Sequence, residues 1–411
     1  MRHITVADIG TCSIKVVMGE LGEGVTSLAG VGKSKSKGVK NGRIVKPSRA
    51  GKSLKEAAER AEEMASRQIQ SIHFGVGGDR LRLSTNEATV TISSEDRIVG
   101  QRDISRLEDL VSSVEVGINE KIISTIPQGF TLDGQQGVTN PVGLQGRRLE
   151  VDATLVTVED KWVNNYRETT SRAGYQFAGL LPLPQCMGSL LMTEEEMKRG
   201  KTLIDFGMET TELLIFKEGE LVEQLTSSLG GKNLTDDLSA KLNVTREKAR
   251  RIKHKFDLSE PGNERKNSRR IEEKRKSSER KKQEAIFSAL TARTQEIFDL
   301  ILSRARERGH NQLLSYGLKI TGGSARQNGL IEFLNDTFDP AFERGTPIRP
   351  VVGIKDVVKD PSYGPVLGLL YYSAGKETEG GETGTFKATK TRLSTWIRDR
   401  LRTFFSIYFC I

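Results

Sequence analysis

The chain has 411 residues, of which 36% are hydrophobic and 28% are charged, and its formal net charge is +9. This length exceeds the size at which a single hydrophobic core usually stops growing, so we expect several subdomains. No run approaches the roughly 20 consecutive apolar residues that span a bilayer, which predicts a soluble or peripheral protein. The three cysteines are isolated and the first residues lack the pattern of a signal peptide, so we expect a cytoplasmic protein without a metal cluster.

The positive charge is concentrated in two segments. Residues 264–282 carry +6 and residues 387–411 carry +5, which leaves −2 for the rest of the chain. The folded body is therefore not basic, and this argues against a broad phosphate-binding face and against nucleic acid as a partner.

The chain opens with an apolar strand at 4–10 and a second strand at 14–21, joined by a tight loop at residues 10–13. A helical segment at 50–68 leads to a further strand that ends in glycines. Residues 201–221 repeat the opening pattern of apolar run, Asp-x-Gly, hydroxyl residues and apolar run. Two copies of one strand-loop-strand unit predict two related α/β lobes that face one another.

Four other segments have distinct compositions. Residues 70–165 are rich in strand patterns, with a helix near 103–115, and predict a small inserted α/β subdomain. Residues 257–284 are almost free of apolar side chains, which predicts a mobile loop or an exposed helix extension. Residues 285–305 have the apolar spacing of a long amphipathic helix, and residues 373–390 read as a flexible linker.

Three short segments share the chemistry of phosphate binding. Glycines let backbone N–H groups approach phosphate oxygens, hydroxyl groups add donors, and a carboxylate at a strand end holds a hydrated Mg²⁺. Each segment alone is ordinary turn chemistry, but their order along the chain is more specific. The segments comprise Asp8, Gly10, Thr11, Cys12 and Ser13; Asp205, Gly207, Thr210 and Thr211; and Thr321, Gly322, Gly323 and Ser324.

This arrangement resembles the actin, sugar kinase and heat-shock chaperone ATPases. The resemblance implies ATP as ligand, with Mg²⁺ held through water by Asp8 and Asp205. It implies that Lys15 reaches the phosphates, although a solvated strand lysine is the alternative. The run Gly230, Gly231, Lys232 and Asn233 opens a helix whose N–H groups could face the nucleotide, or Asn233 could simply cap that helix.

The insertion narrows the resemblance to one family. The runs Ile126-Pro127-Gln128, Asp133-Gly134-Gln135, Asn140-Pro141-x-Gly143 and Gly146-x-x-Leu149-Glu150 resemble the 1C subdomain of FtsA-type division proteins. The implied fold class is α/β: an actin-like two-lobed fold of duplicated ribonuclease H-like cores, with an inserted 1C subdomain and a C-terminal amphipathic helix. The implied subdomains are 1A (1–82 and 163–200), 1C (83–162), 2A (201–243 and 318–360), 2B (244–317), a return helix (361–373), a linker (374–390) and a membrane-targeting helix (391–411).

The same resemblance implies a function and a location. An FtsA-type protein forms ATP-dependent filaments and tethers the tubulin-like FtsZ to the cytoplasmic face of the inner membrane at the septum. It implies that the FtsZ C-terminal peptide contacts 2B near Arg293 and Glu296, and that 1C receives other division proteins. Two departures from the family pattern predict that ATP hydrolysis is slow at most. Glu209 would lie near the phosphates. Arg250 occupies the position where many relatives have a glutamate that contacts the ribose, which leaves Lys253 alone on the adenosine side.

The C-terminal segment predicts an interfacial helix. Its apolar and aromatic residues fall on one half of a helical wheel, with arginines opposite, which suits anionic lipid. A helix docked on the body is the alternative. The membrane-facing set is Leu393, Trp396, Ile397, Arg398, Leu401, Arg402, Phe404, Phe405 and Tyr408. This helix also weighs against two other classes, a superfamily small-molecule kinase and a pilus-assembly-type adaptor.

Overall fold

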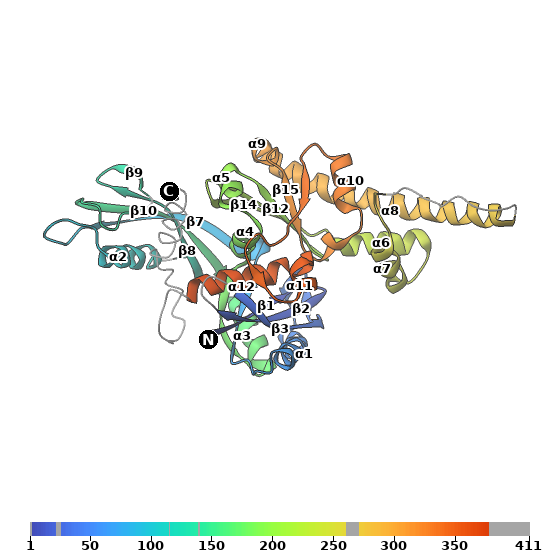
Figure 1. Ribbon diagram of the computed structural model, residues 1–411, viewed down its shortest axis with the longest axis horizontal. Coiled ribbons are helices and arrows are strands. Elements are labelled where there is room, and N and C mark those ends of the chain that lie inside the picture. Colours follow the sequence, from blue (N-terminus) through green and yellow to red (C-terminus); the bar gives the residue numbers. More distant parts are fainter. Residues whose placement is uncertain (1, 22–25, 115, 139, 260–270, 378–411) are drawn as a thin grey trace, which may run out of the picture.

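The computed structural model describes residues 2–21, 26–114, 116–138, 140–259 and 271–377, and it contains two α/β lobes (Figure 1). The sheet of the first lobe has the order β11-β6-β1-β2-β3-β17, and that of the second has the order β14-β13-β12-β15-β16. The strands of the first sheet are β1 (Arg2–Ile9), β2 (Ser13–Leu21), β3 (Thr26–Lys35), β6 (Ser71–Val76), β11 (Gln176–Pro182) and β17 (Val351–Val352). Those of the second are β12 (Thr202–Phe206), β13 (Thr211–Lys217), β14 (Glu220–Ser227), β15 (Leu318–Thr321) and β16 (Phe342–Arg344).

The two sheets repeat one topology. In each, three consecutive strands pair antiparallel, and the first of them pairs parallel with a strand that arrives after a crossover. The predicted duplication is therefore confirmed. Its consequence is that the β1–β2 turn and the β12–β13 turn occupy equivalent places in their lobes.

Helices cover both sheets and fill the space between them. Side chains from α4 (Leu183–Leu191) and α12 (Gly364–Glu377) share one buried cluster with residues of both sheets, such as Val6 and Leu214. On the outer side of the first sheet lie α1 (Pro47–Ala65) and α3 (Asp160–Ala173), with the small hairpin β4 (Val39–Lys40) and β5 (Arg43–Ile44). The core of the two lobes is thus continuous through α4 and α12.

The second lobe carries a helical layer. Buried residues of α6 (Gly231–Leu242), α7 (Arg246–Lys255), α8 (Ile271–Glu307) and α10 (Leu330–Thr337) pack against the outer face of its sheet. Of the two readings of residues 257–284, the structure shows the helical one from Ile271 onward, because α8 has 37 residues and projects from the body (Figure 1). The remaining short helices are α5 (Glu194–Arg199), α9 (Asn311–Leu314), α11 (Lys355–Lys359), η1 (Gly78–Arg80), η2 (Gly323–Arg326) and η3 (Pro361–Tyr363).

The inserted subdomain is present and has its own core. Its sheet has the order β7-β10-β8-β9, with α2 (Gln101–Ser112) packed on one face. Buried apolar residues of α2, such as Ile104 and Leu107, meet Phe130, Leu149 and Val151 of the sheet. The strands are β7 (Leu81–Thr91), β8 (Glu120–Leu132), β9 (Gln135–Val138) and β10 (Arg148–Glu159).

One buried ion pair joins α5 to the second sheet. The carboxylate of Glu196 accepts hydrogen bonds from Lys319 Nζ at 2.7 Å and from Lys201 Nζ at 3.0 Å. Lys319 lies on β15 and is buried. Burial alone would raise the pKa of Glu196, but the bonds from Lys319, the Thr193 amide and Lys201 outweigh it and lower this pKa to about 2.

We predict that Glu196→Gln lowers the free energy of unfolding by about 2 kcal/mol, because a buried ammonium loses its carboxylate. Urea unfolding at pH 7 measures this. Since the pKa of Glu196 is lowered from 4.5 in the folded protein, its stabilisation is present above pH 4.5 and is lost as the pH falls toward 2. Glu195→Gln is the control: Glu195 pairs with Arg199 on the surface and should change stability by less than about 0.5 kcal/mol. Equal effects of the two variants would contradict the prediction.

Candidate functional site

The first predicted loop connects β1 and β2 at the edge of the first lobe. The Gly10 amide donates to the Ser13 carbonyl at 3.2 Å and closes a tight turn. Asp8 and Lys15 are register partners across the two strands, and Lys15 Nζ lies 3.2 Å from Asp8 Oδ2. Lys15 is 7% exposed, so it is not a solvated strand lysine. Its ammonium is held beside the loop, 5.6 Å from the centre of the Tyr363 ring.

The second loop has the same turn. The Gly207 amide donates to the Thr210 carbonyl at 2.9 Å. The Gly207 carbonyl in turn accepts from the Gly231 amide at 3.0 Å and from Ser324 Oγ at 2.7 Å. The second loop, the start of α6 and η2 are thus joined at one carbonyl, and three separate segments predicted from the sequence come together.

Several residues that were predicted to bind the nucleotide form hydrogen bonds with nearby backbone groups. Asn233 is the third residue of α6 and not its N-cap, which is Gly230; its Oδ1 accepts from the Gly230 amide at 3.0 Å and so stabilises the start of the helix. The Thr211 hydroxyl donates to the Leu229 carbonyl at 2.8 Å. These contacts hold the loop and the helix start in position.

The charge of Glu209 in the second loop is compensated by neighbouring groups. Lys232 Nζ lies 2.8 Å from Glu209 Oε1, and the Asn41 amide donates to Glu209 Oε2 at 2.8 Å. Burial raises the pKa of Glu209, but these two hydrogen bonds outweigh it and keep the pKa below its usual value. The neighbouring Gly42 amide donates to Thr11 Oγ1 at 2.9 Å. The β4–β5 hairpin therefore contacts the loops of both lobes.

Three carboxylates lie close together between the loops. Burial raises the pKa of Asp205 to about 7, and the charges of Glu212 and Asp8 add to this effect while Lys15 opposes it. Glu212 was missed from the sequence, where it stands within the apolar run of β13. It is buried, and it accepts hydrogen bonds from the Gly78 amide at 3.0 Å and from Gln224 at 3.3 Å. The only sequence signal was a glutamate in an otherwise apolar strand.

A buried lysine lies beyond the start of α6. Lys253 on α7 is 8% exposed, and its Nζ donates to the Gly231 carbonyl at 2.6 Å. Burial lowers the pKa of this lysine to about 8. Gly322 packs closely against the Asp205 carboxylate, because a Cβ at position 322 would lie 2.1 Å from Asp205 Oδ1. Gly322 also has φ +98°, a conformation that favours glycine.

Comparison with known proteins decides the family. Residues 78–157 match the model of the SHS2 domain inserted in FTSA, and residues 202–368 match that of the cell division protein FtsA, so the two models together match more than half of the chain. The chain belongs to the FtsA family. The FtsA of Pseudomonas aeruginosa is 28% identical over 92% of this chain and 91% of its own length, and that of Bacillus subtilis is 28% identical over 92% and 85%.

Solved structures show the same fold. The PilM-PilN type IV pilus biogenesis complex matches with a TM-score of 0.60 and 18% identity, over 90% of this chain and 98% of that chain. MreB5 of Spiroplasma citri bound to ADP matches with a TM-score of 0.52 and 11% identity, over 92% and 99%. The predicted actin-like fold is confirmed, and this ATPase fold implies nucleotide binding. The FtsA models decide against the kinase and pilus-type alternatives.

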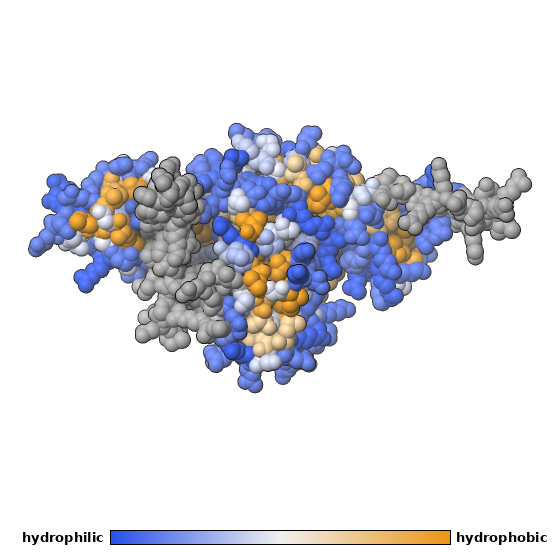
Figure 2. Space-filling model, viewed as in Figure 1, coloured by the Kyte–Doolittle hydropathy of each residue, from blue (hydrophilic) through white to orange (hydrophobic). Residues whose placement is uncertain are grey.

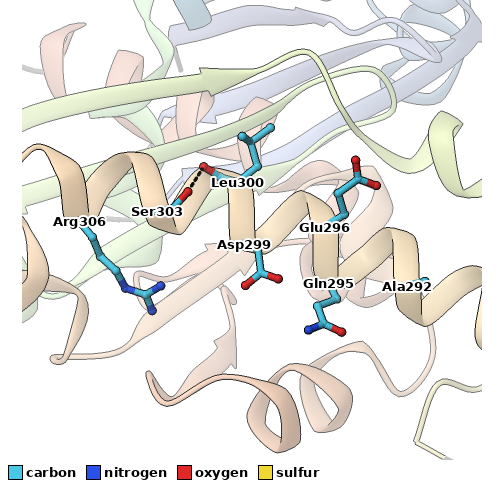
Figure 3. Close-up of a pocket in the computed structure, with 7 residues that line it drawn as sticks. All are labelled: Ala292, Gln295, Glu296, Asp299, Leu300, Ser303 and Arg306. Carbon is cyan, nitrogen blue, oxygen red and sulfur yellow. Dashed lines mark hydrogen bonds between the residues drawn. The ribbon is translucent and has the colours of Figure 1, made fainter.

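Arg293 and Glu296 lie away from the loops, on α8. The Arg293 guanidinium contacts Asp237 of α6, with one N–H···O distance of 3.1 Å, and lies 2.7 Å from Glu296. Glu296 also borders an open groove of about 590 Å³ along α8, together with Asp299 and Arg306 (Figure 3). An acidic ligand at Arg293 would therefore have to compete with two carboxylates.

The predicted membrane-targeting helix is not among the residues that the structure describes. Leu393, Trp396, Ile397, Arg398, Leu401, Arg402, Phe404, Phe405 and Tyr408 lie outside the described residues, as does the linker from residue 378. Within the described part of the chain, no helix is long and apolar enough to cross a bilayer.

We predict that Gly322→Ala destabilises this FtsA-family protein by about 1–3 kcal/mol, because alanine at φ +98° is strained and its Cβ would clash with Asp205. Urea unfolding measures the loss. The adjacent Gly323 is the control, since a Cβ there meets nothing within 4 Å and φ is not positive. Gly323→Ala should change stability by less than about 0.5 kcal/mol. Equal stability of the two alanine variants would contradict the predicted strain and clash at Gly322.

Proposed function

We propose that this FtsA-family protein is a nucleotide-dependent adaptor of the division machinery. It binds Mg-ATP between its two lobes, assembles with copies of itself, and joins FtsZ to the cytoplasmic face of the inner membrane at the septum. The observation that carries the proposal is the pair of equivalent turns, closed by Gly10 and Gly207, that the duplicated sheets place on either side of buried carboxylates.

The residues present fit Mg-ATP. The turns 10–13 and 207–210 offer backbone N–H groups to the phosphates, and Lys15 offers an ammonium. Asp8 and Asp205 suit a hydrated Mg²⁺ held through water. Burial first, and then the charges of Glu212 and Asp8, raise the pKa of Asp205, and a divalent cation beside it would favour the ionised carboxylate. Bound Mg²⁺ would supply charge neutralisation of the β- and γ-phosphates, while Lys253 and residues 322–324 line the nucleoside end.

We predict that Mg-ATP binds with a dissociation constant in the micromolar range and that turnover is slow. Isothermal calorimetry with Mg²⁺ and with EDTA measures binding. Asp205→Asn should remove most of the difference between the two conditions, because it removes one of two carboxylates facing the ion. Glu195→Gln, a charge loss on the distant α5, should behave as wild type. The nucleotide site is wrong if no heat appears at tens of micromolar protein, and the adaptor role is wrong if turnover approaches about 10 s⁻¹.

The inserted subdomain suits protein contacts. Six of its apolar residues are exposed by 38–95%, namely Ile98, Leu110, Val114, Ile118, Val142 and Leu144. The loops carrying Ile98 and Leu144 are hydrogen-bonded to each other through the adjacent Val99, and apolar residues gather on this subdomain at the left of Figure 2. Clustered exposed apolar side chains are typical of protein-binding surfaces. They support self-assembly or contact with other division proteins here.

Charge supports the FtsZ contact at 2B. Arg293 is held in a fixed orientation by Asp237. An acidic C-terminal peptide would replace Glu296, which is 56% exposed, as a partner of Arg293. Residues 391–411 would supply the attachment to anionic lipid through Trp396, Phe404 and the arginines.

We predict that the full chain carries FtsZ into the pellet with anionic vesicles. Arg293→Glu should leave the protein on vesicles but lose FtsZ, because the acidic peptide meets a like charge. Arg280→Glu, the same charge change on an exposed α8 residue, should retain most FtsZ. Deleting residues 391–411 should leave a soluble protein that still binds FtsZ. If the truncated protein still sediments with vesicles, the basic 264–282 segment is the anchor; if Arg280→Glu is as damaging as Arg293→Glu, the contact is not specific.

A further inference from the structure

A cluster of cations lies beside the start of α6, at the nucleoside end of the proposed nucleotide site. Arg250, Lys253 and His254 are spaced three and four residues apart, so they share one face of α7. Arg326 on η2 lies near them, since its charge is among those that lower the pKa of His254. Gln327 Nε2 donates to the Phe256 carbonyl at 2.6 Å and ties η2 to the end of α7. We refer to Arg250, Lys253, His254 and Arg326 as the α7–η2 cluster.

The charges of this cluster are poorly compensated. On the same helix, Arg246 pairs with Asp236 and Arg251 pairs with Glu247. Among the residues that the structure describes, Arg250, Lys253 and His254 form no such ion pair, and the buried Lys253 ammonium donates to a carbonyl. Arg326 has one carboxylate, Asp360, at 3.5 Å. Burial first, and then the neighbouring cations, lower the pKa values of Lys253 and His254.

The position of the cluster relates it to the nucleotide. The Gly231 carbonyl accepts a hydrogen bond from Lys253 Nζ, and the Gly231 amide donates one to the Gly207 carbonyl of the second loop. The cluster therefore lies on the far side of Gly231 from the phosphate loop. A nucleotide whose 5′-phosphates contact the loops would direct its ribose toward these cations.

We propose that the α7–η2 cluster binds a second phosphate group, carried on the ribose, so that the cleft prefers nucleotides phosphorylated at the 2′ or 3′ position as well as at the 5′ position. This inference rests on the proposed nucleotide site. A small ligand suits the cluster better than an acidic protein segment does, because Lys253 is only 8% exposed and its Nζ lies against the Gly231 carbonyl. A phosphate would supply the anion that the surrounding side chains lack.

Calorimetry with the full chain tests the proposal using matched pairs of ligands. The pairs are adenosine 5′-monophosphate against adenosine 3′,5′-bisphosphate and 2′,5′-bisphosphate, and guanosine 5′-diphosphate with and without a 3′-diphosphate. The additional phosphate should tighten binding at least about tenfold in one pair, and this gain should shrink as salt rises. Comparing the pairs identifies the base and the ribose position.

Two neighbouring variants make the test specific. Arg250→Gln should reduce the gain to about twofold or less while leaving the affinity for the 5′-monophosphate within about twofold. Arg251→Gln removes the same charge from a residue that pairs with Glu247, and it should leave the gain intact. If ATP binds but the additional phosphate gives no gain in affinity, this inference alone is overturned. If no nucleotide binds, the proposed nucleotide site is overturned as well. If the two variants have equal effects, the gain is a general effect of positive charge, and the inference is overturned.

Discussion

Negative charge gathered where the two lobes meet constrains the centre of this protein. Asp8 comes from the first lobe, and Asp205 and Glu212 come from the second. The charges of Glu212 and Asp8 add to the cost, set first by burial, of keeping Asp205 ionised. Carboxylates out of water need hydrogen bonds or cations. Lys15 supplies one cation beside Asp8, and the Gly78 amide and Gln224 satisfy Glu212. Because Gly78 opens the inserted subdomain, the same carboxylate that faces the site also fixes the base of that subdomain.

The duplication explains why the site forms between the lobes. Both sheets place a glycine turn after their first strand, and the buried helices α4 and α12 hold the sheets together. The β4–β5 hairpin then contacts both turns, through Gly42 to Thr11 and through Asn41 to Glu209. Glu209 thus has a structural role: its carboxylate links the second lobe to a hairpin of the first and neutralises Lys232. The carboxylate of Glu209 is therefore occupied by these partners within the proposed phosphate loop.

Local patterns predicted what depends on near neighbours along the chain. The strand-loop-strand repeats, the inserted subdomain and the three glycine segments were all visible because periodicity and turn chemistry are local. Partners distant in sequence were not visible. Glu209 and Asn41 are separated by 168 residues and Glu212 and Gly78 by 134, so no pattern could show that the first is compensated or that the second is part of the site. Residues 271–284 likewise lacked an apolar stripe, yet they continue α8 outward from a buried segment that fixes its direction.

In the proposed nucleotide site, the positive charge of the α7–η2 cluster lies at one end and the carboxylates lie at the other. The chain outside its two basic segments has a net charge of only −2. The unpaired cations of the α7–η2 cluster therefore result from where these residues lie in the fold, and not from a general excess of positive charge. A ligand with phosphates at both ends of its sugar would contact the turn at Gly10 in the first lobe and Arg250 in the second. Since a ligand stabilises the state to which it binds, such a molecule would stabilise the contact between the two lobes. The Gly78–Glu212 hydrogen bond links the second lobe to the start of the inserted subdomain, whose exposed apolar residues are the proposed contact with neighbouring subunits.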